Sequence, residues 1–171
     1  EGPTVMPRLW DMHVHLLYAG HPNIQYWHQT YTDRYEREIM PATGRQLLMA
    51  GVTSVRDMGA PSDAVFGFKR RVDMGELEGP TVYAAGPQMQ HAPPDWAQRY
   101  RVGVSGPPDA TAKARQILDR GASLLKVTDA EAMTVDEVSA IVTVAHERGR
   151  LVSAHGRTDA EIRIGLAAGV D

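Results

Sequence analysis

Short apolar runs alternate with longer amphipathic stretches along this chain, and glycines separate many of them. The apolar runs have the length and the branched residues typical of strands. They predict strands at residues 52–55, 81–84, 124–127 and 151–154, with another beginning at Val170. An alternating polar and apolar stretch at residues 11–15 predicts a strand that precedes them. Apolar residues at helical spacing predict helices between these strands, at residues 45–50, 63–77, 110–120, 135–148 and 159–168.

Two of the expected helices carry an explicit start signal. Thr134 with Glu137, and Thr158 with Glu161, both fit the capping box, in which a hydroxyl and a carboxylate bind free amides at a helix N-terminus. Strands that alternate with helices through short turns indicate right-handed βαβ units and a parallel sheet. The sheet could be open and doubly wound, or it could belong to a (β/α) barrel. Length alone favours the open sheet, because a complete eight-stranded barrel typically needs about 250 residues.

Composition limits the classes of partner. With 171 residues, 43% hydrophobic and 23% charged, the chain fits one globular domain. Its formal charge of −3 gives no basic footprint for nucleic acid, and no apolar run reaches the roughly 20 residues of a membrane span. We therefore expect neither nucleic acid nor membrane as a partner. The sequence shows no signal peptide and does not select among cytoplasm, periplasm and secretion.

Titratable residues collect where the expected strands end. His13 and His15 end the first strand, Arg56 and Asp57 end the second, and His155 ends the fifth. Catalytic and binding groups of parallel α/β folds gather at this edge of the sheet. The repeated placement indicates one functional site, although Arg56 and Asp57 could equally form a structural ion pair.

The first strand carries a pattern suited to metal binding. Asp11, His13 and His15 lie at alternate positions, so a regular strand would place them on one face. Two neutral imidazoles can hold a divalent ion, and the carboxylate of Asp11 could orient one of them by accepting its other N–H. The alternative is the solvated face of an edge strand. Since the chain has no cysteine, a metal site must use His, carboxylate or modified side chains.

Lys126 lies inside the apolar run at residues 124–127, and lysine is rarely buried without a partner. Its ammonium could reach solvent at the strand end and pair with Asp129. Alternatively, burial lowers its pKa and leaves a neutral amine, which CO2 can convert to a carbamate. A carbamate has two oxygens and could bridge two metal ions.

Several motifs follow one another along nearly the whole chain. They are Asp11-Met12-His13-Val14-His15, Gly51-Val52-Thr53-Ser54-Val55-Arg56-Asp57-Met58-Gly59, Gly79-Pro80-Thr81, Lys126 and Ser153-Ala154-His155-Gly156. Together and in this order they resemble the amidohydrolase superfamily. The resemblance is greatest to its imidazolonepropionase-like and Xaa-Pro dipeptidase (prolidase-type) branch.

The resemblance implies an α/β fold in which residues 1–171 form part of a TIM (β/α)8 barrel, namely strands 1 to 5 and the start of strand 6. It also implies two divalent metal ions, usually zinc, at the barrel mouth. His13 and His15 would bind one ion, His155 the other, and Lys126 as a carbamate would bridge both. A hydroxide between the ions would attack the carbonyl of an amide, peptide or lactam.

A histidine near the third strand often contacts substrate in related enzymes, and His91 is the candidate here. The alternative is an ordinary loop histidine close to Pro93 and Pro94. The other histidines, His21, His28 and His146, are assigned to the surface or to packing.

The sequence also departs from the family. Members have a further histidine ligand after strand 6 and a proton-handling aspartate after strand 8, and this chain ends at Asp171. No catalytic base is therefore assigned within it. We expect a fragment of a longer enzyme, inactive alone; pairing with a second chain and a truncated product are the alternatives. Self-association would cover the open barrel edge. The competing function is a metal-binding or assembly fragment without catalysis.

Overall fold

The computed structural model describes residues 2, 5 and 7–171 of the chain. The strands form two parallel sheets, one in the order β1-β2-β3 and the other in the order β5-β4-β6-β7. They are β1 (Leu9–Val14), β2 (Val52–Asp57), β3 (Thr81–Ala84), β4 (Gln88–Gln90), β5 (Arg101–Gly103), β6 (Leu125–Val127) and β7 (Val152–Ala154). The main-chain N–H of Ser123 donates to the carbonyl of Ala84 over 2.8 Å and links the two sheets.

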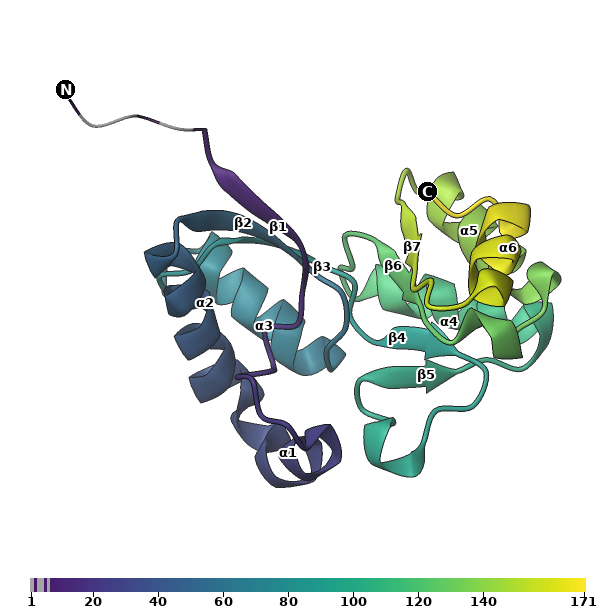
Figure 1. Ribbon diagram of the computed structural model, residues 1–171, viewed down its shortest axis with the longest axis horizontal. Coiled ribbons are helices and arrows are strands. Elements are labelled where there is room, and N and C mark those ends of the chain that lie inside the picture. Colours follow the sequence, from purple (N-terminus) through teal and green to yellow (C-terminus); the bar gives the residue numbers. More distant parts are fainter. Residues whose placement is uncertain (1, 3–4, 6) are drawn as a thin grey trace.

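Helices cover one face of each sheet. Helices α2 and α3 pack against β1, β2 and β3, while α4, α5 and α6 pack against the other sheet (Figure 1). The α-helices are α1 (Ile24–Tyr31), α2 (Met40–Met49), α3 (Ser62–Asp73), α4 (Gly106–Asp119), α5 (Val135–Glu147) and α6 (Asp159–Ala168). Shorter turns of helix are η1 (Thr32–Arg34), η2 (Tyr35–Ile39), η3 (Asp95–Ala97) and η4 (Ala130–Ala132).

The predicted parallel α/β fold is confirmed, and the barrel is not closed. The five predicted strands correspond to β1, β2, β3, β6 and β7. At the predicted start of a sixth strand, the N–H of Asp171 donates to the carbonyl of Val152 over 3.1 Å, which lays this residue beside β7. On the face away from the helices, Trp10 is 50% and Leu151 is 56% exposed. They line an open cavity of about 170 Å³ together with Tyr83, as expected of an incomplete barrel.

Both predicted capping boxes are present, and they fix the starts of α5 and α6. The hydroxyl of Thr134 accepts from the N–H of Glu137, whose carboxylate accepts from the N–H of Thr134. Thr158 and Glu161 make the same exchange. The predicted helix at residues 45–50 begins earlier, at Met40, because η1 and η2 lead directly into α2.

Helix α1 and the short strands β4 and β5 were not predicted. Helix α1 has an Asn23 cap and buries His28 among aromatic rings, and it shows no regular apolar stripe in the sequence. Strands β4 and β5 are three residues each, and β4 is fully buried although it contains Gln88 and Gln90. Polar residues in so short a segment resemble a loop, so tertiary contacts decide these elements. None of the helices in the described part of the chain is long and apolar enough to cross a membrane.

Glu137 joins two helix N-termini and should therefore matter for stability. It is 4% exposed, and its carboxylate accepts N–H groups from Gly106 and Thr134, each over 2.7 Å. Replacing it with Ala leaves both donors without a partner and should cost about 2–4 kcal/mol of unfolding free energy. The neighbouring exposed Asp136→Ala is the control, expected to cost under about 1 kcal/mol. Urea unfolding measures both, and equal losses would contradict this role of Glu137.

Candidate metal centre

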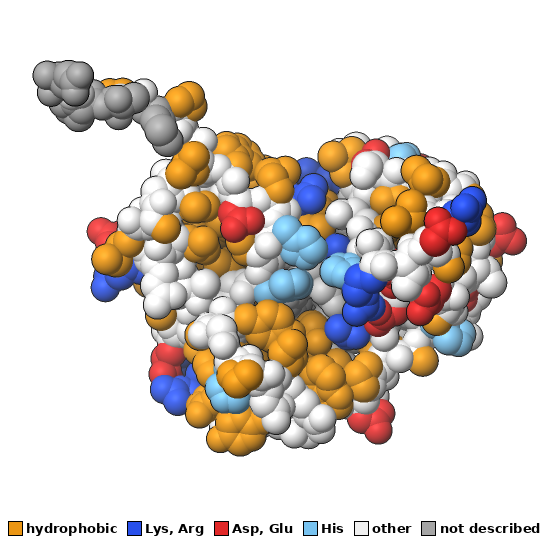
Figure 2. Space-filling view, viewed as in Figure 1, with side chains coloured by type: hydrophobic (Ala, Val, Ile, Leu, Met, Phe, Trp, Pro, Cys, Tyr) orange, Lys and Arg blue, Asp and Glu red, His pale blue; other side chains and the backbone are white. Residues whose placement is uncertain are grey.

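Three histidines and one lysine come together where parallel strands end. His13 lies at the end of β1, His15 directly follows that strand, and His155 directly follows β7. The ring centroids of His13 and His15 are 5.5 Å apart, and those of His13 and His155 are 6.1 Å apart. Histidine side chains gather where the two halves of the molecule meet, with basic side chains beside them (Figure 2). The structure thus brings the ends of the first and last strands to one place.

A β-bulge in β1 changes which residues share this face. Trp10 pairs with Ser54 and Asp11 with Val55, whereas Val14 pairs with Asp57, so β1 contains one extra residue. Regular alternation, as expected from the sequence, would place Trp10 opposite His13. Because of the bulge, Trp10, which stacks on Tyr83, lies on the same open face as His13.

Asp11 does not orient an imidazole, as was expected from the sequence, because the same bulge changes its position. Its carboxylate accepts from the main-chain N–H of His13 over 3.0 Å and contacts no imidazole. The orienting acceptor is a main-chain carbonyl, since Nδ1 of His15 is 3.1 Å from the oxygen of Gly59. A carbonyl can only accept, so Nδ1 carries the proton and Nε2 keeps its lone pair. His15 is therefore in the tautomer that binds a metal through Nε2.

Lys126 is buried on the inner side of β6. It is 1% exposed, between Leu125 and Val127, whose side chains lie in the helix-covered core. Burial, together with the nearby charge of Arg56, lowers its pKa to about 8. Within the described residues, its ammonium makes no ion pair, and it is not among the fully buried polar atoms that lack a partner. Asp129, the partner considered from the sequence, is occupied by Arg101 and Arg157.

The titration of the histidines also indicates closeness to Lys126. Burial lowers the pKa of His13, and the charge of Lys126 lowers it further. Burial also lowers the pKa of His155, and the charge of Lys126 is the second cause. Both imidazoles are therefore neutral near pH 7, which is the form that binds metal ions.

The side chains of His13, His15, His155 and Lys126 are of the types that bind divalent metal ions. Within the described residues, no three His, Cys, Asp or Glu side chains are close enough to hold an ion by themselves. The pair His13 and His15 nevertheless has a suitable separation, because two imidazoles on one tetrahedral zinc would place their centroids about 5 Å apart. The buried amine of Lys126, with a pKa of about 8, is the fourth group beside the three histidines. These residues fit the expected metal site, and the binding itself remains a proposal.

A family comparison agrees with the order of the motifs along this chain. The family model described as "Amidohydrolase family" matches residues 4–171. The chain belongs to the amidohydrolase family. No curated protein matches it in sequence.

Solved structures agree with this amidohydrolase assignment. A protein from Bifidobacterium longum described as a candidate prolidase is 28% identical with a TM-score of 0.74, covering 97% of this chain and 39% of that one. A Xaa-Pro dipeptidase with bound methionine is 25% identical with a TM-score of 0.71, covering 96% and 47%. Ochratoxinase from A. niger shares the fold at 20% identity and a TM-score of 0.78, covering 97% and 46%. The chain thus spans less than half the length of these structures.

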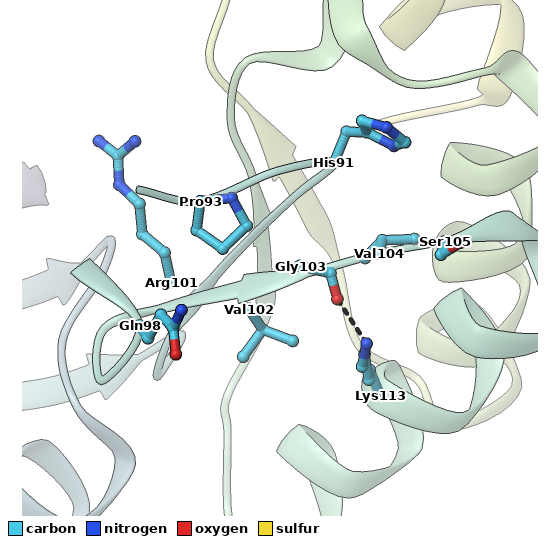
Figure 3. Close-up of a pocket in the computed structure, with 9 residues that line it drawn as sticks. All are labelled: His91, Pro93, Gln98, Arg101, Val102, Gly103, Val104, Ser105 and Lys113. Atoms are coloured by element: carbon cyan, nitrogen blue, oxygen red, sulfur yellow. Dashed lines mark hydrogen bonds between the residues drawn. The ribbon is translucent and has the colours of Figure 1, made fainter. Parts of the chain in front are cut away.

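His91 lies apart from the histidine cluster of this amidohydrolase. It is exposed, follows β4, and lines an open cavity of about 440 Å³ with Arg101 and Lys113 (Figure 3). Contact with a substrate stays a prediction for His91.

The other histidines have structural partners. His28 is 4% exposed and stacks on Tyr100 with centroids 4.1 Å apart, as expected of a packing residue. Its ring nitrogens lie 3.1 Å and 2.6 Å from the hydroxyls of Tyr18 and Tyr35, and burial lowers its pKa to about 4. His146 pairs with Asp171 over 3.0 Å.

Sequence reasoning missed the groups that support the ligands. The carbonyl of Gly59 carries no side-chain signal, and only its place after Asp57 in the second motif could have pointed to it. The suspected Arg56–Asp57 ion pair does not form. Arg56 donates instead to the carbonyl of Met12 over 2.8 Å.

The lowered pKa of Lys126 predicts a pH-dependent stability. The folded state favours the neutral amine, so Lys126 destabilises the metal-free fold at pH 7, and this cost disappears as the pH rises from about 8 to the ordinary value of 10.5. Lys126→Met should raise the unfolding free energy by about 3 kcal/mol at pH 7, with the gain shrinking toward pH 10. Denaturant unfolding with a chelator in CO2-free buffer measures the difference. Lys69→Met, which removes a lysine paired with Asp73 one turn along α3, should change little at any pH; a gain for Lys126→Met that is constant with pH would contradict the assignment.

Proposed function

We propose that this chain is the N-terminal part of a metal-dependent hydrolase that cleaves C–N bonds of an amide, peptide or lactam. Membership of the amidohydrolase family supports a hydrolase of C–N bonds. The observation that carries the metal site is Lys126, which is 1% exposed and close enough to His13 and His155 to lower their pKa. A buried lysine in such a place needs a function.

In this proposal His13, His15, His155 and Lys126 as its carbamate would be the residues that hold the divalent metal, which would supply an acidified water and a Lewis acid. Zinc suits imidazole and carboxylate-like oxygen donors, although manganese and cobalt suit them too. Bound ions of this kind acidify water and polarise a carbonyl, which is the chemistry that hydrolysis of an amide requires.

The protein prepares Lys126 for this role by desolvation. With a pKa of about 8, an appreciable fraction of its amine is neutral at pH 7. The neutral amine can add to CO2, which forms an N–C bond and releases one proton. Two cations would then neutralise the charge of the carbamate, so that burial no longer opposes an ionised group there.

The remaining ligand and the group that handles the proton would come from strands beyond those described. The exposed cavity lined by Trp10, Tyr83 and Leu151 marks the side on which such strands would pack. They would come from the rest of a longer chain or from a second copy. We propose that the 171-residue chain alone binds metal and has no turnover.

The substrate is proposed by likeness. The solved structures with at least 25% identity include a Xaa-Pro dipeptidase and a candidate prolidase. They favour a small substrate or peptide with an amide bond to proline. Substrate loops in this fold vary independently of the metal site. The proposed proline substrate therefore rests on likeness alone, whereas hydrolysis of a C–N bond rests on the family.

Replacing Lys126 with Ala in the whole protein that contains this chain tests the function. Loss of the bridging group should remove the paired ions and reduce hydrolysis of an Xaa-Pro dipeptide at least about 100-fold. Lys69→Ala is the matched control, because Lys69 pairs with Asp73 one turn along α3, and it should keep full activity. Full turnover and full metal content in Lys126→Ala would contradict the proposal.

A further inference from the structure

Asp57 is a fully buried carboxylate that the metal site does not use directly. It ends β2 and is 0% exposed. Its oxygens bind main-chain donors: Oδ2 accepts the N–H of Leu16 over 2.8 Å and Oδ1 accepts the N–H of Gly59 over 3.1 Å. A buried carboxylate is stabilised by such donors, so both oxygens have a partner.

The bond to Leu16 and a main-chain bond of Val14 hold the chain on both sides of His15. Leu16 follows the histidine directly. On the other side, the carbonyl of Val14 accepts the N–H of Met58 over 2.9 Å. The main chain of His15 is thus tied to the end of β2 before and after its side chain.

Gly59 completes this arrangement through its carbonyl, which accepts Nδ1–H of His15. A Cβ at this position would lie 2.7 Å from Cγ of Gln88, so only glycine fits so close to β4. The side-chain amide of Gln88 donates to the carbonyl of Met58 over 3.1 Å and holds the same loop from the other side. The direction of the Gly59 carbonyl is therefore fixed by Asp57 and Gln88 together.

We propose that Asp57 is the positioning residue for His15: through the N–H groups of Leu16 and Gly59 it aims the Gly59 carbonyl at Nδ1 and keeps Nε2 free for a metal. This inference rests on the proposed metal role of His15. It assigns to Asp57, acting through main chain, the orienting task that the sequence suggested for Asp11.

A carboxylate is required because both partners are donors. Asparagine has the same shape, but it offers one oxygen and turns an NH2 group toward the second N–H. One of the two bonds is then lost, and a donor remains buried without an acceptor. Asp57→Asn should therefore loosen either Leu16 or Gly59 and release His15.

Two-bond 1H–15N correlation spectra of the metal-free chain test the proposal, because they show which imidazole nitrogen carries the proton. The spectra are recorded about two units above the ordinary imidazole pKa of about 6.5. In the unaltered protein His15 should show the Nδ1–H form. In Asp57→Asn it should become a mixture that includes the Nε2–H form.

Two control variants separate this effect from general loosening. Val82→Ala destabilises the core beside β2 without touching the loop at Gly59, and Asp11→Asn alters the carboxylate bound to His13. Both should leave His15 in the Nδ1–H form. If Asp57→Asn kept the Nδ1–H form, or if Val82→Ala lost it equally, the proposal would be overturned. An Nε2–H form in the unaltered protein would overturn it as well, even if Asp57→Asn failed to fold.

Zinc titration of the same proteins gives the second readout. Loss of an orienting group typically weakens metal affinity 10- to 100-fold, so Asp57→Asn should bind zinc about 10-fold or more weakly, while Val82→Ala stays within about 3-fold. If the tautomer changed as expected but the unaltered chain bound no zinc, the metal function would fail and the control of His15 by Asp57 would stand.

Discussion

Parallel strand pairing is the constraint on which the rest of this structure depends. Because all the described strand pairs are parallel, their carboxyl ends lie at one edge. Residues far apart in sequence therefore meet there, as His13 and His155 do with centroids 6.1 Å apart. Helices cover the other face of each sheet with apolar side chains.

Desolvation then gives these residues their chemistry. Lys126 lies on the inner face of a strand whose neighbours pack into the core, and its pKa falls to about 8. The same burial, with the charge of Lys126, keeps His13 and His155 neutral. The fold thus holds the imidazoles in the uncharged form that metal binding needs and shifts the amine of Lys126 toward its uncharged form, at a cost in stability that bound cations would offset.

The order of strands and helices could be predicted from the sequence, because glycines between elements, capping boxes and apolar runs are local signals. The strand ends that carry Lys126 and His155 followed from them. The bulge in β1 could not be predicted, since it results from pairing with Val55 and Asp57, 44 and 43 positions away from Asp11 and Val14. The carbonyl of Gly59 was missed for a related reason: a main-chain group leaves no mark in the residue pattern.

The binding of divalent metal by His13, His15, Lys126 and His155 is the central claim, and elemental analysis of the purified 171-residue chain tests it most directly. The chain is loaded with zinc in bicarbonate buffer and desalted, beside a variant with both His13 and His15 changed to Ala. The account predicts about two zinc ions per chain and a clear loss in the variant. A chain that retains no more zinc than the variant would contradict it.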